Sequence, residues 1–236
     1  MPSPEGSARD GPRPPAITPG RSVMRKQMAS KTLVGLAVLA AAAGSPRTLF
    51  ADAADAQSSP AEKKSLEVGD PAPAWSKLEG VDGKKHSLAD LKEAKAVAVV
   101  FTTNHCPVAK AYEDRLVALH KQYADKGVAL VAINVNNNEA DRLPKMKERA
   151  EEKGFQFDYL YDSSQKIGRA FGATVTPHAF LLDGNRKVVY MGAIDDNQDE
   201  DKVENHYLKD AIDAVLAGNA PEPATTKQFG CGIQYE

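Results

Sequence analysis

Apolar residues between positions 66 and 219 are arranged in two patterns, and each predicts a different kind of element. Continuous apolar runs at 96–101 and 128–135 have the length of a strand and are typical of strands buried on both faces. Within 107–123 and 203–216, apolar side chains recur every three or four residues, which predicts amphipathic helices. The apolar face of the first helix consists of Tyr112, Leu116, Leu119 and Tyr123. The apolar face of the second consists of Val203, Tyr207, Leu208, Ala211, Ile212, Val215 and Leu216.

Two Asp-Gly pairs predict hairpin turns. The first, at 82–83, joins 75–81 to 84–86, and the second, at 183–184, joins 179–182 to 187–191. Both pairs lie between segments of strand-like composition. We therefore expect an antiparallel hairpin near each end of the domain.

Further elements are expected between the second buried strand and the second hairpin. Pro144 begins a helix that Gly154 ends. A short strand is expected at 157–161, followed by a helix that Ser163 or Ser164 caps and that ends before Gly172.

The order of these elements predicts the fold class. Strands alternate with helices, and then a hairpin and a covering helix follow, which indicates an α/β fold with a mixed central sheet flanked by helices. The small hairpin at 75–86 is an N-terminal extension of that sheet. We expect one domain at 66–219, of ordinary size for a single core, preceded by a linker at 57–65 and followed by a tail at 220–236.

The first 56 residues have a different composition and predict a leader. Residues 1–23 are rich in Pro, Gly, Ser and Arg, whereas a basic run at 24–26 precedes an apolar run at 33–43 and A-x-A sites that end at Ala53 and Ala56. This succession is typical of a secretory signal peptide, and the apolar run is short for a permanent membrane span. We expect an exported protein, periplasmic or extracellular. Met24 makes a more ordinary start than Met1, although a long basic region beginning at Met1 is the alternative.

Charge and cysteine content narrow the function. The net charge is −2, and the lysines and glutamates are scattered, so no basic stripe indicates a nucleic-acid partner. The chain has two cysteines, Cys106 and Cys231. In an exported protein two cysteines can form and keep a disulfide.

Cys106 is the main candidate for chemistry. It lies between the apolar run at 96–101 and Pro107, a residue favoured at the first position of a helix, so Cys106 is expected to be the helix N-cap. Unpaired N–H groups and the helix dipole at that position favour the thiolate, which is the nucleophilic form. A small buried structural cysteine is the alternative.

Three motifs occur in order at 68–73, 103–107 and 174–177: Val-Gly-Asp-Pro-Ala-Pro, Thr-Asn-His-Cys-Pro and Thr-Val-Thr-Pro. Together they resemble the thioredoxin-like superfamily, and within it the redoxin branch of alkyl hydroperoxide reductases and thiol-specific antioxidant proteins with their exported relatives. The resemblance covers roughly 66–218. It implies a thioredoxin-like fold in which a cis Pro177 packs beside Cys106 and shapes a groove where a partner chain docks.

The sequence departs from the family's patterns in ways that bear on the chemistry. Ala109 stands where a Cys-x-x-Cys pair would have its second cysteine, so exchange within one motif is excluded. Val99 stands where a peroxiredoxin has a proline, and Pro177 lies about where its arginine would fall. Of those three peroxiredoxin residues only Thr103 is present, and a β-favouring role is its alternative interpretation.

Polar residues near Cys106 are further candidates. A cationic His105 would lower the pKa of the neighbouring thiol, and a solvent-exposed loop histidine is the alternative. Thr176 and His178 flank Pro177 and are expected to line the groove, unless His178 simply ends a strand. Cys106 and the two histidines make a poor metal site because two of them are adjacent in the sequence, so we expect no metal and no cofactor.

Cys231 lies between two glycines in the tail and is a candidate resolving thiol for Cys106. A static disulfide between the same two cysteines, or an unpaired thiol, is the alternative. A bond that closes so long a loop would stabilise the fold by about 4–5 kcal/mol in the chain-entropy model. Phe229 is expected to anchor the tail against the face that carries Cys106 and Pro177.

These features predict an exported thiol-based oxidoreductase. Cys106 would attack a disulfide of a partner protein or a peroxide, and Cys231 would resolve the intermediate. The alternative is a redox-inactive binding module that holds a partner protein in the groove beside Pro177. The absence of a thiol at Ala109 favours the alternative, whereas the helix-capping position of Cys106 opposes it.

Overall fold

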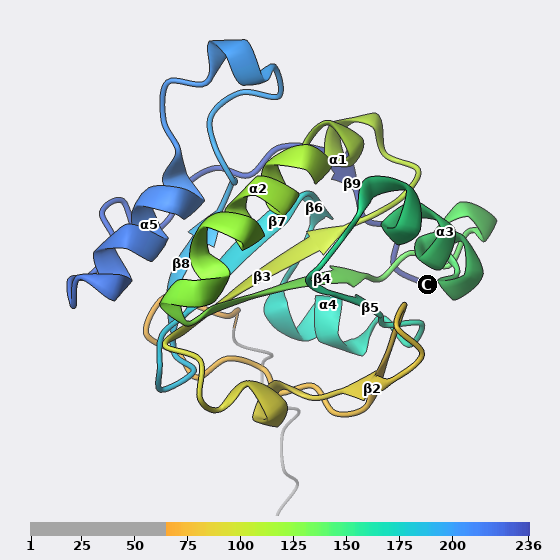
Figure 1. The fold of residues 1–236 in the computed structure, drawn as a ribbon, viewed down its shortest axis with the longest axis horizontal. Helices are drawn as coiled ribbons and strands as arrows, with labels where there is room; N and C mark the ends of the chain where they lie inside the picture. The colour runs from red at the N-terminus through yellow and green to blue at the C-terminus, as the bar shows by residue number, and fades with distance from the viewer. Residues whose placement is uncertain (1–64) are drawn as a thin grey trace, which may run out of the picture. The chain divides into compact units, whose positions relative to one another are not determined.

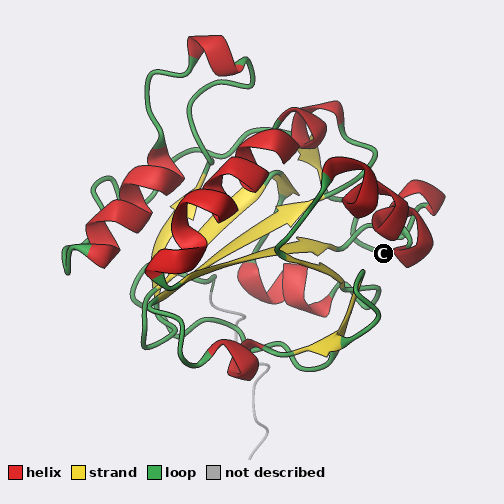
Figure 2. Cartoon of the chain, in the orientation of Figure 1, coloured by secondary structure: helices red, strands yellow, loops and turns green. Residues whose placement is uncertain are grey.

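A seven-stranded mixed sheet, with strand order β2-β1-β5-β4-β3-β7-β8, forms the centre of the fold (Figures 1 and 2). The computed structural model describes residues 65–236, so the expected leader, with Ala53 and Ala56, lies outside the described residues. The strands are β1 (Leu78–Gly80), β2 (Lys85–His86), β3 (Ala96–Thr102), β4 (Val128–Asn134), β5 (Asp158–Tyr161), β7 (His178–Leu182) and β8 (Val188–Gly192). A separate two-stranded sheet joins β6 (Val175–Thr176) to β9 (Cys231–Gly232).

Helices cover both faces of the large sheet. The α-helices are α1 (Pro107–Ala111), α2 (Glu113–Tyr123), α3 (Leu143–Lys153), α4 (Lys166–Phe171) and α5 (Tyr207–Leu216). Short 3-10 segments are η1 (Leu88–Leu91), η2 (Ala124–Lys126), η3 (Glu139–Asp141) and η4 (Glu200–Lys202). Buried side chains of α2, α3 and α5 share one core cluster, and Phe171 of α4 belongs to the cluster on the opposite face. The predicted α/β fold with a mixed sheet and an N-terminal hairpin is confirmed.

The continuous apolar run of β3 follows from this two-sided cover. All seven of its residues are buried, and alternate side chains enter opposite cores: Val100 lies in one cluster and Phe101 in the other. β3 pairs in parallel with β4 and antiparallel with β7, so it has neighbours on both edges as well. Strands that are buried on both faces carry such uninterrupted apolar sequences.

The segment 107–123, expected to present one helical face, is divided into α1 and α2 at Tyr112. The Tyr112 N–H bonds to the carbonyls of Ala109 and Lys110, which tightens the last turn of α1. Tyr112 still lies in the core with Leu116, so the apolar periodicity located the right face although the helix is interrupted.

Two other helix starts differ from the prediction. The N-cap position of α4 is Gln165, not Ser163 or Ser164, although the Ser164 hydroxyl accepts the N–H of Lys166 at 3.3 Å. The Asp162 carboxylate accepts the N–H groups of Ile167 and Gly168 at 2.8 and 3.3 Å. A carboxylate satisfies these free donors as well as a hydroxyl does.

The final helix begins at Tyr207 and not at Val203. Val203 is the C-cap of the 3-10 segment η4. The loop before α5 is closed by Asp196, which accepts backbone N–H groups of Glu204 and Asn205, both at 3.0 Å. No helix within residues 65–236 is both long and apolar enough to cross a lipid bilayer.

The C-terminal residues are held against the domain by backbone hydrogen bonds. Met191 N–H bonds to the Ala224 carbonyl at 3.1 Å, and Ile233 N–H bonds to the Thr174 carbonyl at 2.9 Å. The Tyr235 hydroxyl donates to the Ala173 carbonyl at 2.7 Å. The tail therefore runs from the end of β8 past β6 to α4.

Candidate active site

Cys106 lies where β3 leaves the sheet and α1 begins. It is the N-cap of α1, Pro107 is the first helical residue, and the Ala109 N–H points at the Cys106 sulfur from 3.4 Å. The side chain is fully buried. The predicted capping position is confirmed, and it directs a backbone donor at the sulfur.

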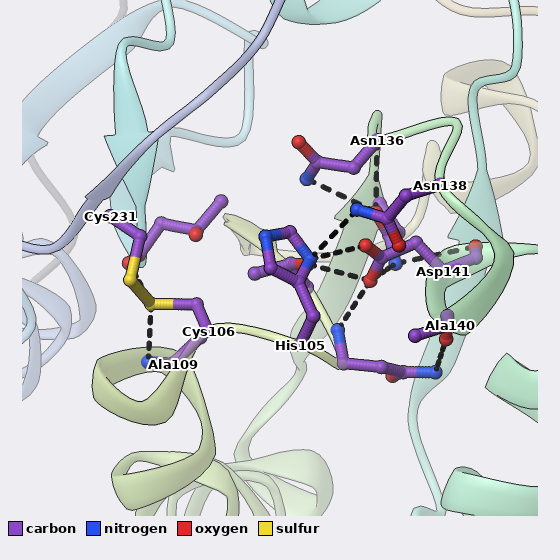
Figure 3. Close-up of polar contacts among 12 residues, drawn as sticks. His105, Cys106, Ala109, Asn136, Asn138, Ala140, Asp141 and Cys231 are labelled. Carbon is purple, nitrogen blue, oxygen red and sulfur yellow. Dashed lines mark hydrogen bonds and ion pairs between the residues drawn. A yellow bond between two sulfur atoms is a disulfide. The ribbon is translucent and has the colours of Figure 1, made fainter.

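The sulfur of Cys106 is bonded to Cys231, with 6.0 Å between the two Cα atoms (Figure 3). The predicted pairing of the two cysteines is confirmed. Phe229, two residues earlier, packs edge-on against Tyr112 with 6.2 Å between ring centroids, as expected for the anchor of the tail.

Pro177 is joined to Thr176 by a cis peptide bond, as predicted. The Thr176 carbonyl oxygen lies 3.5 Å from the Cys106 sulfur. In the disulfide this sulfur has no proton to donate, so the contact becomes a hydrogen bond only when Cys106 is a thiol. Thr176 also pairs with Cys231 across β6 and β9, so backbone contacts fix the position of Cys231 beside Thr176.

A buried carboxylate, Asp141, lies on the side of His105 away from the disulfide (Figure 3), and no motif in the sequence indicated it. Its Oδ1 accepts the Thr103 hydroxyl at 2.6 Å, the Asn104 backbone N–H at 2.6 Å and the Asn134 side-chain amide at 3.0 Å. Its Oδ2 bonds to Nδ1 of His105. One side chain thus collects four donors, one from Asn134 at the end of β4 and three from the loop between β3 and α1.

These donors decide the charge of Asp141. Burial acts to raise the pKa of this carboxyl, but the hydrogen bonds from Thr103, Asn134, the Asn104 backbone and His105 outweigh burial and lower the pKa. Asp141 is therefore a carboxylate at neutral pH. Since a carboxylate only accepts, the proton of the shared hydrogen bond is on Nδ1 of His105.

Asp141 consequently sets the orientation of His105. The imidazole side chain is 42% exposed, and its Nδ1 faces Asp141, Thr103 and Asn138. In Figure 3 the other ring nitrogen is turned away from Asp141, on the side that holds the disulfide. A hydrogen bond at one imidazole nitrogen leaves the other available for acid–base chemistry.

His178 is placed quite differently. It follows Pro177 in β7, is 2% exposed, and stacks near Phe180 with 4.5 Å between ring centroids. Neither ring nitrogen has a hydrogen-bond partner, and burial lowers its pKa to about 4. With the disulfide formed, the His178 ring is therefore buried against Phe180 and does not line an open groove, unlike the expectation from the sequence.

Residues 65–236 bring no three histidine, cysteine or acidic side chains together as a metal ion would require. Asp141 could have been found from the topology: β3 and β4 are parallel and in register at Thr102 and Asn134, so their carboxyl ends meet. The loop that follows 128–135 therefore lies next to the loop that carries Cys106, and its polar side chains can bond to residues there.

Comparison with known proteins agrees with the fold. Residues 67–207 match the family described as Redoxin. Thiol-disulfide oxidoreductase ResA of Bacillus anthracis is 29% identical over 129 residues, which cover 55% of this chain and 71% of the relative.

Two solved structures resemble the chain over most of their length. The hypothetical protein SMc02350 of Sinorhizobium meliloti 1021 is 32% identical, with a TM-score of 0.69 over 73% of this chain and 97% of that one. An uncharacterized conserved protein of Geobacillus kaustophilus is 36% identical, with a TM-score of 0.66 over 72% and 93% of the two chains. A DsbE-like structure from Chlorobium tepidum, at 22% identity and a TM-score of 0.51, supports the thioredoxin-like fold alone.

Proposed function

Because this chain belongs to the Redoxin family, we propose that it is a thiol–disulfide oxidoreductase with Cys106 as nucleophile and Cys231 as resolving thiol. The observation that carries the proposal is the disulfide that joins Cys106, at the start of α1, to Cys231 in the strand beside Thr176 and Pro177. The name of the ResA relative supports the same reaction class.

The exchange has two balanced steps. The Cys106 thiolate attacks one sulfur of a partner's disulfide, which forms a mixed disulfide and releases the partner's other sulfur as a thiolate. The Cys231 thiolate then attacks the Cys106 sulfur, which releases the partner's second thiolate and leaves the Cys106–Cys231 disulfide. The partner gains two electrons and this protein loses two, so a dithiol reductant must restore it.

Three residues assist this chemistry. The Ala109 N–H stabilises the Cys106 thiolate. His105, held by Asp141, presents its second nitrogen on the side of the disulfide, where it can exchange a proton with a departing or attacking sulfur. Asp141 acts through His105 and is a positioning residue.

Disulfide exchange fits the site better than peroxide reduction does. The Thr103 hydroxyl donates to Asp141 at 2.6 Å, so its hydrogen is already engaged and is not offered to a peroxide bound at Cys106. Thr103 therefore supports the orientation of Asp141 and His105 in this proposal. Thr176 and Pro177 are both buried in this oxidised form, with the Thr176 carbonyl oxygen 3.5 Å from the Cys106 sulfur.

Thiol release from oxidised glutathione tests the function. The reduced wild-type protein is expected to release two glutathione thiols for each chain and to regain its disulfide. Cys231→Ser is expected to release one and to keep glutathione on Cys106, and Cys106→Ser is expected to release none on the same time scale. Mass spectrometry and thiol titration read both outcomes.

Other results would contradict the proposal. Reaction of Cys106→Ser at the wild-type rate would assign the nucleophile to Cys231. A reduced wild-type protein that consumed hydrogen peroxide much faster than it exchanged with disulfides would be a peroxidase. A wild-type protein inert to both would favour the redox-inactive module that binds a partner beside Pro177.

We also propose that the protein is exported to the periplasm or the extracellular space. The basic run, apolar run and A-x-A sites before position 57 support export, and a disulfide persists in an oxidising compartment. The mature chain is expected to begin just after Ala53 or Ala56. Intact-mass measurement of the secreted protein would contradict this if residues before Leu33 were still attached.

A further inference from the structure

The strand that carries Cys231 is an added strand at the edge of β6. β9 pairs antiparallel with β6, with Thr176 opposite Cys231 and Val175 opposite Gly232, and Figure 1 shows β9 between β6 and α1. The next tail residue continues the contact, because Ile233 N–H bonds to the Thr174 carbonyl at 2.9 Å. The tail thus reaches Cys106 as an extended segment held by main-chain groups.

The approach of this segment is tightest at Gly230. A Cβ at that position would lie 2.1 Å from the Thr176 carbonyl oxygen and 2.7 Å from its carbon, and both are backbone atoms that cannot turn aside. Gly230 also has a φ of +150°, which side-chain-bearing residues rarely adopt. Gly232, on the other side of Cys231, would place a Cβ in open space.

Side chains anchor the segment on both sides of the cysteine. Phe229 packs on Tyr112, which belongs to the core cluster that α2, α3 and α5 share. Ile233 packs against the cluster on the opposite face of the sheet. Three features therefore define the place that β9 occupies: the backbone edge of β6, the position of Gly230, which admits only glycine, and the apolar contacts of Phe229 and Ile233.

The family resemblance implies that a partner chain docks beside Pro177, and the tail now occupies this place, hereafter the β6 seat. We propose that the tail is a built-in competitor for the β6 seat, and that a partner segment needs glycine immediately before its reacting cysteine. The inference rests on the proposed exchange at Cys106. A partner sulfur that bonds to Cys106 must take the place that the Cys231 sulfur now holds. The Thr176 carbonyl oxygen lies 3.5 Å from the Cys106 sulfur, and Thr176 is the residue opposite Cys231 in the β6–β9 pair. The backbone of an arriving partner segment therefore meets the same edge as the tail does.

The competition orders the reaction. The β6 edge pairs with one strand at a time, so the tail must leave before a partner segment binds. The partner's backbone must then leave β6, while its sulfur is still bonded to Cys106, before Cys231 can return. The partner is thus an extended, glycine-preceded cysteine segment of a flexible or unfolded polypeptide region.

Activated peptides test the seat on the full-length Cys231→Ser protein. The probe is a copy of residues 225–236 whose cysteine forms a disulfide with 2-thiopyridine. The Cys106 thiolate attacks the peptide sulfur, forms the mixed disulfide and releases 2-thiopyridone, whose absorbance gives the rate. Two matched peptides carry Gly230→Ala or Gly232→Ala.

The Gly230→Ala peptide is expected to react at least about tenfold more slowly than the unchanged peptide, and the Gly232→Ala peptide within about twofold of it. The protein's own tail should show the converse effect. Adding Gly230→Ala to the Cys231→Ser protein should unseat the tail and speed reaction with the unchanged peptide, whereas adding Gly232→Ala should not.

Reaction with a small disulfide distinguishes failure of the β6 seat from failure of the proposed exchange at Cys106. If 2,2′-dithiodipyridine modifies Cys106 but the three peptides react alike, the β6 seat is wrong and the proposed function stands. If Cys106 of the folded protein does not react with dithiodipyridine either, the proposed function itself fails.

Discussion

Asp141 and His178 are both buried at the end of the sheet that carries Cys106, yet the surroundings of Asp141 stabilise its charged form and those of His178 its neutral form. Asp141 is fully buried and accepts hydrogen bonds from four groups, so it remains a carboxylate. His178 is 2% exposed with neither ring nitrogen bonded, so it remains neutral. Burial alone therefore does not decide the charge of a group at this site; the number of hydrogen-bond partners does.

The difference also separates two kinds of support for the cysteine. On the side of the carboxylate, hereafter the carboxylate side, the side chains of Thr103, Asn134 and His105 all donate to Asp141. On the side of the disulfide, β6 and β9 pair through their backbones, and His178, which follows β6 and Pro177, packs against Phe180. The first arrangement orients a proton-exchanging ring, and the second positions a sulfur.

Removing the carboxylate should have the largest effect. Asp141→Ala leaves the donors of Thr103, Asn104 and Asn134 without their shared acceptor and should lower the free energy of unfolding by about 3–5 kcal/mol. Chemical denaturation at pH 7 measures the change. Glu139→Ala, an exposed acidic residue of the same 3-10 segment, should change it by less than about 0.5 kcal/mol. Equal effects of the two variants would show that Asp141 has no special role.

Acid titration should resolve His178 from Asp141. The folded pKa of His178 is about 4, below the unfolded value of about 6.5, so the unfolded state binds more protons between these values. The wild-type protein should lose roughly 3 kcal/mol as the pH falls from 6.5 to 4. His178→Phe should remove most of that loss, whereas His206→Gln, at an exposed histidine, should keep it. An unchanged pH dependence in His178→Phe would contradict a buried neutral imidazole.

The contribution of Asp141 has the same direction but a lower window. Because its pKa is lowered in the folded protein, its stabilisation is present above the unfolded value of about 3.9 and is lost as the pH falls through the lower folded value. Acid unfolding of Asp141→Ala should therefore differ from that of the wild type below about pH 4 and resemble it in the window of His178.

The smallest expected effect concerns one donor of the carboxylate side. Thr103→Val removes the hydroxyl that donates to Asp141 and should cost about 1–2 kcal/mol of unfolding free energy. Thr103→Ser restores a hydroxyl and should recover most of the loss. If Thr103→Val alone leaves both stability and the rate of glutathione exchange unchanged, Thr103 does not support the orientation of His105.

Much of the fold was predictable because its signals are local. Continuous apolar runs predicted β3 and β4, Asp-Gly pairs predicted both hairpins, and Pro107 predicted that Cys106 caps α1. Helix ends were less predictable where the capping group lies outside the usual pattern. At the start of α4, Asp162 shares the capping with Ser164, and the segment 107–123 is interrupted at Tyr112.

The sequence by itself determined what adjacent residues encode: the buried strands, the capped cysteine and, because two cysteines are present, the pair that can be joined. Only the tertiary structure decided which distant groups meet them. His105 and Asp141 are 36 positions apart, and Cys106 and Cys231 are 125 apart, so no local periodicity records that a carboxylate orients the imidazole or that Gly230 passes against Thr176. These contacts arise because parallel strands bring their carboxyl ends to one edge, and because the tail finds unpaired backbone groups on β6.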